Sequence, residues 1–558
     1  MICGLYKHKR VSLFFLSVLA DHRLLLLFLI YKGGIEMKLS KIAAIVIGTA
    51  MLFASTTMAA EYDAANPPVA DTAQGQLLGF MDEGTFAFLG IPYATAGRFE
   101  EPQKVEPWDG IRSAQTYGTI CPIPDQTSVG SDEMFWPHRY WIQNEDCMNL
   151  NVWTQSLDAE AKKPVLVFFH GGGYTNGSSI ESAAYDGKNL SAFGDVVVVT
   201  VNHRLNVLGF LDLSAYGEEY KNTANLGIMD LVASLEWVKE NIANFGGDPD
   251  NVTIFGQSGG GGKVTTLMRV PAAEGLFSKA ICQSGLKGGS AKEDKQAEAA
   301  KLLEALGLDE NGIEELKTMD YHTLIATATE AGLSWGPEND GEYILEDYCD
   351  WTKNIPFMAS TVFSEFSYTW MFDGPNKNEW SEDETMENLK ALYGDKAEEI
   401  AEEFKNVFPD RPLADAYFYD AYLAWAPISR AGVENILDDR LLTTEAPVYE
   451  YLFDYEVPVN GGALAFHCSD LIYVFHNVDI PVVTRATGGD ETAHKVQDQV
   501  AGAIVAFAST GDPSTEGLEW KPYTAEEKNM MHFSAESECK VLGDEHLIEL
   551  YAEAAGQE

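Results

Sequence analysis

Short runs of continuous apolar residues alternate with stretches of helical periodicity through the first half of the chain. The clearest apolar runs are 164–169, 196–201 and the run that ends at Phe255. A strand that is covered on both faces in a parallel sheet has this pattern. The stretch 227–244 instead repeats every three to four residues, and one face carries Leu231, Leu235, Val238 and Ile242. The alternation predicts an α/β protein with a large, mainly parallel central sheet flanked by helices.

Further elements extend this prediction to the C-terminal half. Strands are predicted over 86–94, 279–284 and 448–453, and a helix over 497–507. The stretch 144–153 alternates in its second half, which predicts a half-exposed strand. Two acidic regions rich in Ala, Glu and Leu, 291–330 and 382–440, have helical patterns. We expect them to be helical insertions over the carboxyl edge of the sheet, where ligands bind in such folds.

The strand that ends at Phe255 leads into Gly256-Gln257-Ser258-Gly259-Gly260. This sequence fits the G-x-S-x-G turn that lifts a nucleophilic serine above a sheet, and the glycines permit the tight backbone path that such a turn requires. The helix that follows directs its free N–H groups toward the same point. The alternative is an ordinary Gly-Ser turn. A phosphate-binding loop is excluded, because Val264 follows Lys263 and no glycine stands six residues before that lysine.

Acyl transfer by a serine also requires donors for the oxyanion. Gly171, Gly172 and Gly173 follow a predicted buried strand, where a loop of this kind is expected. Glycine N–H groups can approach a developing negative charge closely. The alternative is a flexible turn without a catalytic role. By the same reasoning, the N–H of Gly259 is a third expected donor.

A histidine base and a carboxylate that orients it are expected after the serine. His467 lies in a loop before an apolar segment, but composition does not separate it from His476, His494 and His532. For the acid, 355–366 predicts a buried strand that leads into a loop with one carboxylate, Glu365. Asp340 and Glu346 are alternatives in a more polar stretch.

Composition narrows the functional classes. The 558 residues are 46% hydrophobic, which is sufficient for a large core, and the formal net charge is −47. This charge argues against nucleic-acid binding and disfavours anionic membrane surfaces. After residues 1–60 are set aside, 31 Lys/Arg and 83 Asp/Glu remain, so residues 61–558 carry a net charge of −52.

The N-terminus predicts export. Residues 37–60 combine a short basic segment, an apolar run too short to span a bilayer comfortably and a small-residue end, which is typical of a signal peptide. Residues 1–36 do not fit that design, so we expect translation to begin at Met37. The alternative is a hydrophobic anchor. The expected product is secreted or periplasmic, without stable membrane insertion of the mature chain. Export permits disulfides among its six cysteines, and no C-x-x-C spacing indicates a metal.

Over residues 70–555 the sequence resembles the type-B carboxylesterase family of the α/β-hydrolase superfamily, relatives of the cholinesterases. The shared motifs occur in family order: 90–94, 145–147, 170–173, 202–211, 241–249 and the turn around Ser258. The resemblance implies an α/β-hydrolase fold and a triad of Ser258, Glu365 and His467. It also implies oxyanion donors at Gly172, Gly173 and Gly259, a disulfide between Cys121 and Cys147, and no cofactor or metal.

The sequence departs from the family at several positions near these residues. Gln257 stands where the family usually has Glu, which removes a negative charge near the imidazolium that forms during catalysis. Gly259 replaces an alanine, and Cys468 replaces a glycine beside the proposed base. Ser364 and Phe366 stand where Asp and Gly are favoured around the acid. Ser284 resembles a family serine near the triad.

The resulting expectation is an exported serine hydrolase that acts on small-molecule carboxylic esters through an acyl-enzyme. A non-catalytic binding or adhesion protein and an interfacial lipase are the alternatives. Several aromatic residues and one methionine are candidates for a substrate pocket, although core packing is their alternative role. They are Met134, Phe135, Trp136, Tyr140, Trp141 and Trp335. The sequence indicates neither acyl preference nor oligomeric state.

Overall fold

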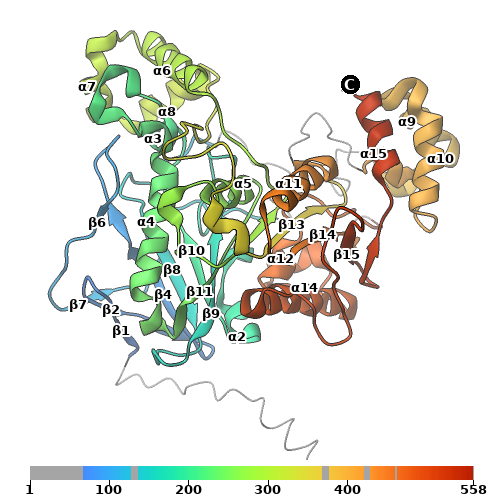
Figure 1. Ribbon diagram of the computed structural model, residues 1–558, viewed down its shortest axis with the longest axis horizontal. Coiled ribbons are helices and arrows are strands. Elements are labelled where there is room, and N and C mark those ends of the chain that lie inside the picture. The colour runs from blue at the N-terminus through green and yellow to red at the C-terminus, as the bar shows by residue number, and fades with distance from the viewer. Residues whose placement is uncertain (1–66, 127–135, 367–375, 420–427, 459–460, 557–558) are drawn as a thin grey trace, which may run out of the picture. The chain divides into compact units, whose positions relative to one another are not determined.

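The computed structural model describes residues 67–126, 136–366, 376–419, 428–458 and 461–556. Within these residues an eleven-stranded sheet has the order β16-β15-β14-β13-β12-β11-β9-β10-β8-β4-β3 (Figure 1). Its strands are β3 (Phe80–Asp82), β4 (Thr85–Pro92), β8 (Asn149–Thr154), β9 (Lys163–Phe169), β10 (Val197–Val201), β11 (Gly247–Gln257), β12 (Lys279–Gln283), β13 (Phe357–Val362), β14 (Val448–Phe453), β15 (Asn529–Phe533) and β16 (Glu538–Val541). The predicted segments 1–36 and 37–60 lie outside the described residues.

Seven consecutive strands of this order, from β15 to β10, are parallel to one another. Strands β8, β4 and β3 at one end and β16 at the other are antiparallel. The predicted α/β class with a large, mainly parallel sheet is therefore confirmed. The prediction that the strand within 144–153 is half-exposed was wrong, because β8 is buried along its whole length between β10 and β4.

Alternate side chains of each strand enter two different cores. On β9, Val165, Val167 and Phe169 pack with α4 and α5, whereas Leu166 and Phe168 pack with α14 on the other face. This division explains the continuous apolar runs, since both faces of the sheet are covered. The helices on the sheet are α2 (Lys188–Gly194), α4 (Leu226–Asn241), α5 (Gly259–Leu267), α11 (Arg430–Thr443) and α14 (Glu491–Thr510).

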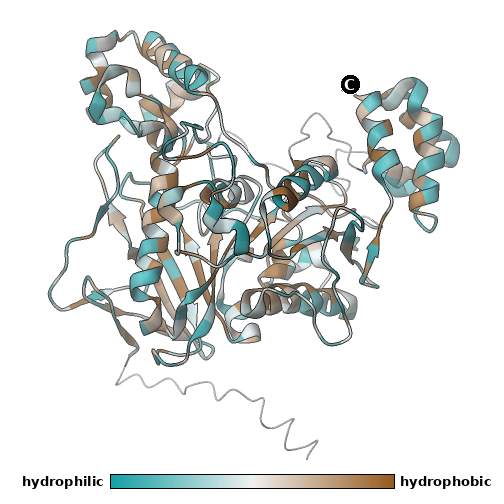
Figure 2. Ribbon diagram, viewed as in Figure 1, coloured by the Kyte–Doolittle hydropathy of each residue, from teal (hydrophilic) through white to brown (hydrophobic). Residues whose placement is uncertain are grey.

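The two acidic regions contain helices. The range 291–330 holds α6 (Lys292–Leu306), α7 (Ile313–Thr318) and α8 (Tyr321–Glu330), which share a separate core with the short helix α3 (Asn206–Phe210). The range 382–440 holds α9 (Glu382–Tyr393), α10 (Ala397–Val407) and the start of α11, and α10 packs on α15 (Glu545–Ala554). Figure 2 shows hydrophilic residues on the outer faces of α6, α9 and α10, as expected for amphipathic helices.

A small sheet and several short elements complete the described chain. They are β1 (Val69–Asp71), β2 (Gln76–Leu78) and β7 (Ile111–Ser113) of a three-stranded sheet, the pair β5 (Ala94–Thr95) and β6 (Gln103–Lys104), and the helices α12 (Leu471–Val474) and α13 (Thr484–Thr487). Across the described ranges, none of the helices has the length and apolarity needed to cross a bilayer.

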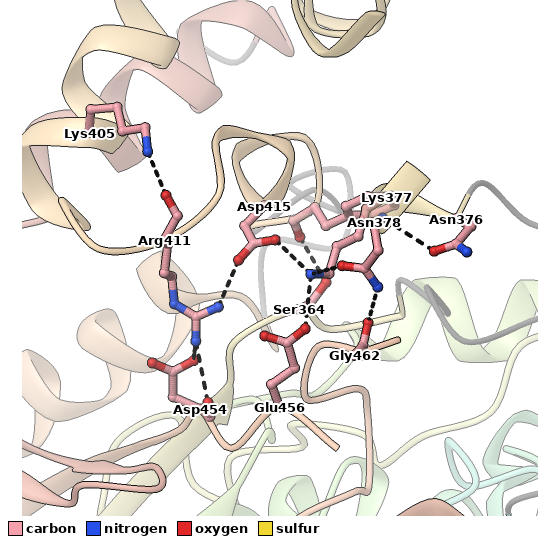
Figure 3. A network of polar contacts seen from close by, with 11 residues as sticks. Ser364, Asn376, Lys377, Asn378, Lys405, Arg411, Asp415, Asp454, Glu456 and Gly462 are labelled. Carbon is pink, nitrogen blue, oxygen red and sulfur yellow. Dashed lines mark hydrogen bonds and ion pairs between the residues drawn. The ribbon is translucent and has the colours of Figure 1, made fainter. Parts of the chain in front are cut away.

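A buried ion-pair network supports the segments beyond the ends of β13 and β14 (Figure 3). Lys377 Nζ lies 2.9 Å from Asp415 Oδ1 and 3.0 Å from Glu456 Oε1, and Asp415 also pairs with Arg411. Arg411 in turn contacts Asp454, directly after β14. Because each buried charge has an opposite partner, the network fixes these segments without leaving an unpaired ion. The loops that carry Glu365 and His467 begin at these same strand ends.

Candidate active site

Strand β11 ends at Gln257, and α5 begins at Gly259, so Ser258 occupies the turn between them. Its backbone has φ 58° and ψ −126°, a strained conformation for a residue with a side chain. The turn requires glycine at 260, where a Cβ atom would lie 2.0 Å from the carbonyl oxygen of Phe169. The N–H of Ser258 donates to Gln283 O at 2.9 Å, which fastens the turn to β12. These features place Ser258 at the carboxyl edge of the sheet.

The loop 170–173 leaves the carboxyl end of the neighbouring strand β9. Its carbonyl oxygens all accept hydrogen bonds within the protein. The donors are Lys263 Nζ to His170 O (2.7 Å), His170 Nδ1 to Gly171 O (3.0 Å), the N–H groups of Thr175 and Asn176 to Gly172 O (3.1 and 3.0 Å), and Thr175 Oγ1 to Gly173 O (3.3 Å). With the carbonyls held, the orientation of the peptide planes between them is fixed.

The N–H groups of Gly172, Gly173 and Gly259 have no hydrogen-bond partner among the described residues. Gly172 and Gly173 have φ values of +87° and +58°, which favour glycine. A Cβ atom on Gly259 would lie only 2.8 Å from the nitrogen of Gly173. The glycine that replaces the family's alanine therefore allows the loop to pack directly on the start of α5. The three predicted oxyanion donors lie beside one another and beside Ser258.

The predicted acid and base are in contact. His467 Nδ1 is bonded to Glu365 Oε2, and the other carboxylate oxygen, Oε1, accepts the N–H of Val362 at 3.1 Å. Both side chains are buried. Their loops are paired directly, since Ser364 N donates to Ala465 O at 3.0 Å. Phe366 stacks on the imidazole with ring centroids 4.2 Å apart, so the aromatic residue that replaces a family glycine covers one face of the base.

The alternatives left open by the sequence lie elsewhere. His476 and His494 pair with Asp498 and Asp479, and His532 is buried in β15, where burial lowers its pKa to about 3. Of the alternative acids, Asp340 accepts three backbone N–H groups of its own turn through Oδ1. Glu346 is exposed. Of these candidate acids and bases, only Glu365 and His467 contact each other.

Gln257, which stands where the family usually has glutamate, also contacts His467. Its Nε2 atom lies 3.3 Å from Nδ1 and 3.2 Å from Nε2 of His467, and its Oε1 accepts the thiol of Cys468 at 3.1 Å. The Ser258 hydroxyl has no hydrogen-bond partner within the described chain. Catalytic hydrogen bonds are often loose before substrate binds. Because this amide nitrogen is almost equally far from both ring nitrogens, it lies over the face of the imidazole rather than in line with the nitrogen that would receive the serine proton.

Cys468 adopts φ +72°, a left-handed conformation that explains why a glycine is usual at this position. Replacing Cys468 with glycine is expected to raise the free energy of unfolding by ~1 kcal/mol relative to Cys468→Ala, because alanine keeps the strained Cβ and glycine removes it. Urea unfolding of the two variants under matched conditions measures this difference. Equal stability of the two variants would contradict a strained backbone at this residue.

These residues open onto a cavity of about 560 Å³. The triad candidates Ser258 and His467, the loop 171–173, Trp136 and Trp335 line it. Two of the predicted pocket aromatics therefore contact the cavity, whereas Tyr140 and Trp141 are 53% and 40% exposed and are not among its lining residues. Met134 and Phe135 lie outside the described residues.

The predicted Cys121–Cys147 disulfide is not formed in this structure. Both residues are buried free thiols. The hydrogen bond that the Cys147 thiol makes to neighbouring Cys121, together with burial, raises the pKa of Cys147 well above its usual value. The two thiols are thus adjacent, as the resemblance implies, and their covalent pairing stays a prediction.

The sequence pattern did not mark Lys263 as a site residue, and this lysine entered only the exclusion of a phosphate-binding loop. This lysine stands on α5 among Gly, Val, Thr and Leu residues. A single charged residue on an otherwise uncharged helix that follows a buried strand was the available signal.

Comparison with known proteins identifies the family. Residues 66–548 match the Carboxylesterase family. The chain is 32% identical over 492 residues to a para-nitrobenzyl esterase of Bacillus subtilis, covering 84% of this chain and 95% of that protein. It is 30% identical to a phenmedipham hydrolase of Pseudarthrobacter oxydans, covering 86% and 95%. A solved esterase from Clostridium hathewayi superposes with a TM-score of 0.82 at 40% identity, covering 88% and 99% of the two chains. The protein is therefore an ester hydrolase of the carboxylesterase family, with the α/β-hydrolase fold of that family's solved structures.

Proposed function

We propose that this protein hydrolyses carboxylic esters through a Ser258–His467–Glu365 triad and an acyl-enzyme intermediate. The observation that carries the proposal is the buried His467–Glu365 contact beside Ser258, at a cavity edge where three backbone N–H groups have no partner among the described residues. A nucleophile, a base, an orienting acid and oxyanion donors are the parts that serine ester hydrolysis requires.

In the proposed reaction, Ser258 Oγ attacks the ester carbonyl carbon and its proton passes to His467 Nε2. The carbonyl oxygen becomes an oxyanion, which the N–H groups of Gly172, Gly173 and Gly259 stabilise. His467 then returns the proton to the leaving alcohol, and water repeats the two steps on the acyl-enzyme. Glu365 holds the imidazole by its Nδ1 nitrogen and stabilises the imidazolium.

For the substrate we propose esters that carry an aromatic acyl or alcohol group. Trp136 and Trp335 provide flat apolar walls in the cavity, and rings stack well on such surfaces. The Clostridium hathewayi esterase is described as able to hydrolyse aliphatic aromatic polyesters. We extend the proposal to short aromatic ester oligomers, which are small enough to place one ester bond at Ser258.

Export is proposed on the sequence pattern of residues 37–60 alone. An oxidising compartment after export supports the further proposal that Cys121 and Cys147 become a disulfide there. Buried neighbouring thiols are the arrangement from which such a bond forms.

The proposal is tested by covalent trapping with a fluorophosphonate ester. The probe is expected to lose fluoride and phosphonylate Ser258 Oγ, and hydrolysis is expected to fall in step with labelling. Peptide mass spectrometry locates the adduct. The buried Ser284, on the neighbouring strand end, provides a matched comparison, since Ser284→Ala is expected to label like wild type. A labelled residue other than Ser258, or hydrolysis that persists after full labelling, would refute the assignment.

A further inference from the structure

Lys263 lies on the second turn of α5, directly behind the loop that carries Gly172 and Gly173. The side chain has 0% exposure, and its ammonium donates to the carbonyl oxygen of His170 at 2.7 Å. It lies 5.7 Å from the centre of the Tyr174 ring. No carboxylate forms an ion pair with it among the described residues. A buried charge without a counter-ion is costly to the fold, so its presence requires a reason other than stability.

The groups around Lys263 leave its positive charge largely uncompensated. His170 and His203 stack with ring centroids 5.2 Å apart, and burial, aided by the Lys263 charge, lowers the pKa of both imidazoles well below the usual range. Burial likewise lowers the pKa of Lys263 to about 7, against the opposing effects of Glu181 and Cys121. The titratable groups facing it are therefore His170, Tyr174, His203, Glu181 and Cys121.

The His170 carbonyl that Lys263 binds is the first of the four held carbonyls of the loop 170–173. The start of α5 packs so closely on this loop that a Cβ atom on Gly260 would lie 3.0 Å from the same His170 oxygen. Lys263 is thus the only side chain of α5 among the described residues that donates a hydrogen bond to this loop. The carbonyl that it binds belongs to the peptide directly before the two whose N–H groups, those of Gly172 and Gly173, have no partner among the described residues. In its protonated state, the ammonium beside this loop favours a negative charge that develops at the loop's N–H groups.

We propose that Lys263 is a positioning residue of the oxyanion hole, which fixes the 170–173 loop through the His170 carbonyl and adds a positive charge behind it. This inference rests on the proposed function and adds a residue that acts on the transition state through the loop. Its effect is expected mainly in kcat, because the ground-state ester carries no formal charge for Lys263 to stabilise.

The test compares Lys263→Met with Lys279→Met. Lys279 is also a buried lysine with a pKa lowered by burial, to about 8, but it begins β12 at the opposite end of the strand from the site. Lys263→Met is expected to lower kcat on p-nitrophenyl acetate by roughly 10-fold or more, with KM changed less than about twofold. Lys279→Met is expected to leave both constants near those of wild type.

A trifluoromethyl ketone provides a second readout. Ser258 adds to its carbonyl carbon, the proton passes to His467, and the product carries an oxyanion. Its inhibition constant is expected to rise in Lys263→Met by the same factor as kcat/KM falls, which a purely structural lysine would not produce. Lys263→Gln, which keeps a donor but no charge, is the second variant if Lys263→Met does not fold, and a similar loss is expected.

The outcomes separate this inference from the proposed function. An inert wild-type protein that also fails to bind the ketone would refute the proposed triad. An active wild type, with unchanged kcat and unchanged ketone affinity in a folded Lys263 variant, would overturn the role of Lys263 alone. A raised KM with kcat preserved would also overturn it, because that pattern indicates altered substrate binding.

Discussion

Replacement of Ser258 by alanine is expected to lower kcat for ester hydrolysis by at least ~10⁴-fold, because it removes the hydroxyl that is proposed to form the acyl-enzyme. The turn itself should persist. Its geometry is set by the close approach of Gly260 to Phe169 and by the hydrogen bond from the Ser258 N–H to Gln283, neither of which uses the hydroxyl. Initial rates on a short-chain and an aromatic p-nitrophenyl ester measure the loss.

Ser284→Ala is the matched control for that experiment. Ser284 also has a positive φ, +41°, is fully buried, and follows the strand next to β11. Its substitution removes a hydroxyl without removing the proposed nucleophile, so kcat should remain within about threefold of wild type. If Ser258→Ala retained a hundredth or more of the wild-type rate while the control behaved as expected, the nucleophile would have to be another residue.

Replacement of Glu365 by glutamine is expected to lower kcat by roughly 10³–10⁴-fold. The amide cannot stabilise the imidazolium as a carboxylate does, and its NH₂ group competes with the Nδ1 proton that fixes the tautomer of His467. The remaining oxygen can still accept the N–H of Val362, so the loop is expected to stay folded. Steady-state rates, with near-ultraviolet circular dichroism as the check on folding, measure this effect.

Glu346→Gln is the comparison for Glu365→Gln. The sequence admits both carboxylates as the acid, and Glu346 is exposed, so its substitution should leave kcat unchanged. Near-normal turnover by Glu365→Gln would show that the contact with His467 is not the orienting pair. Loss of activity in both variants would point to a general effect of removing acidic charge from this strongly anionic protein.

The Gln257–Cys468 pair was visible in the sequence only as two departures from a family pattern. The structure shows that they are one feature, because the thiol of Cys468 donates to the amide oxygen whose nitrogen contacts His467. A sequence cannot link residues 211 positions apart without the fold that brings their loops together. The strain at Cys468 likewise depends on a backbone angle that no residue type specifies.

The burial of a strand is likewise not fully predictable from the sequence pattern. The stretch that forms β8 alternates apolar and polar residues, which predicts a strand with one solvent-exposed face. The structure buries both faces, because Asn151 and Thr200 bond to each other inside the sheet rather than to water. Polar residues that satisfy one another in the core are not distinguished by pattern from polar residues that face solvent.

The sequence by itself determined the parallel sheet, the glycine-rich turns at Ser258 and Gly172, and the family. These depend on local rules, since a run buried on both faces must be apolar and a crowded turn must be glycine. Only the tertiary structure decided which histidine and which carboxylate meet, and that Lys263 donates a hydrogen bond to the loop 170–173. Those choices depend on the pairing of Ser364 with Ala465 and on the packing of α5 against β9. Contacts between distant segments follow from how strands and loops are ordered in space, which short-range pattern does not encode.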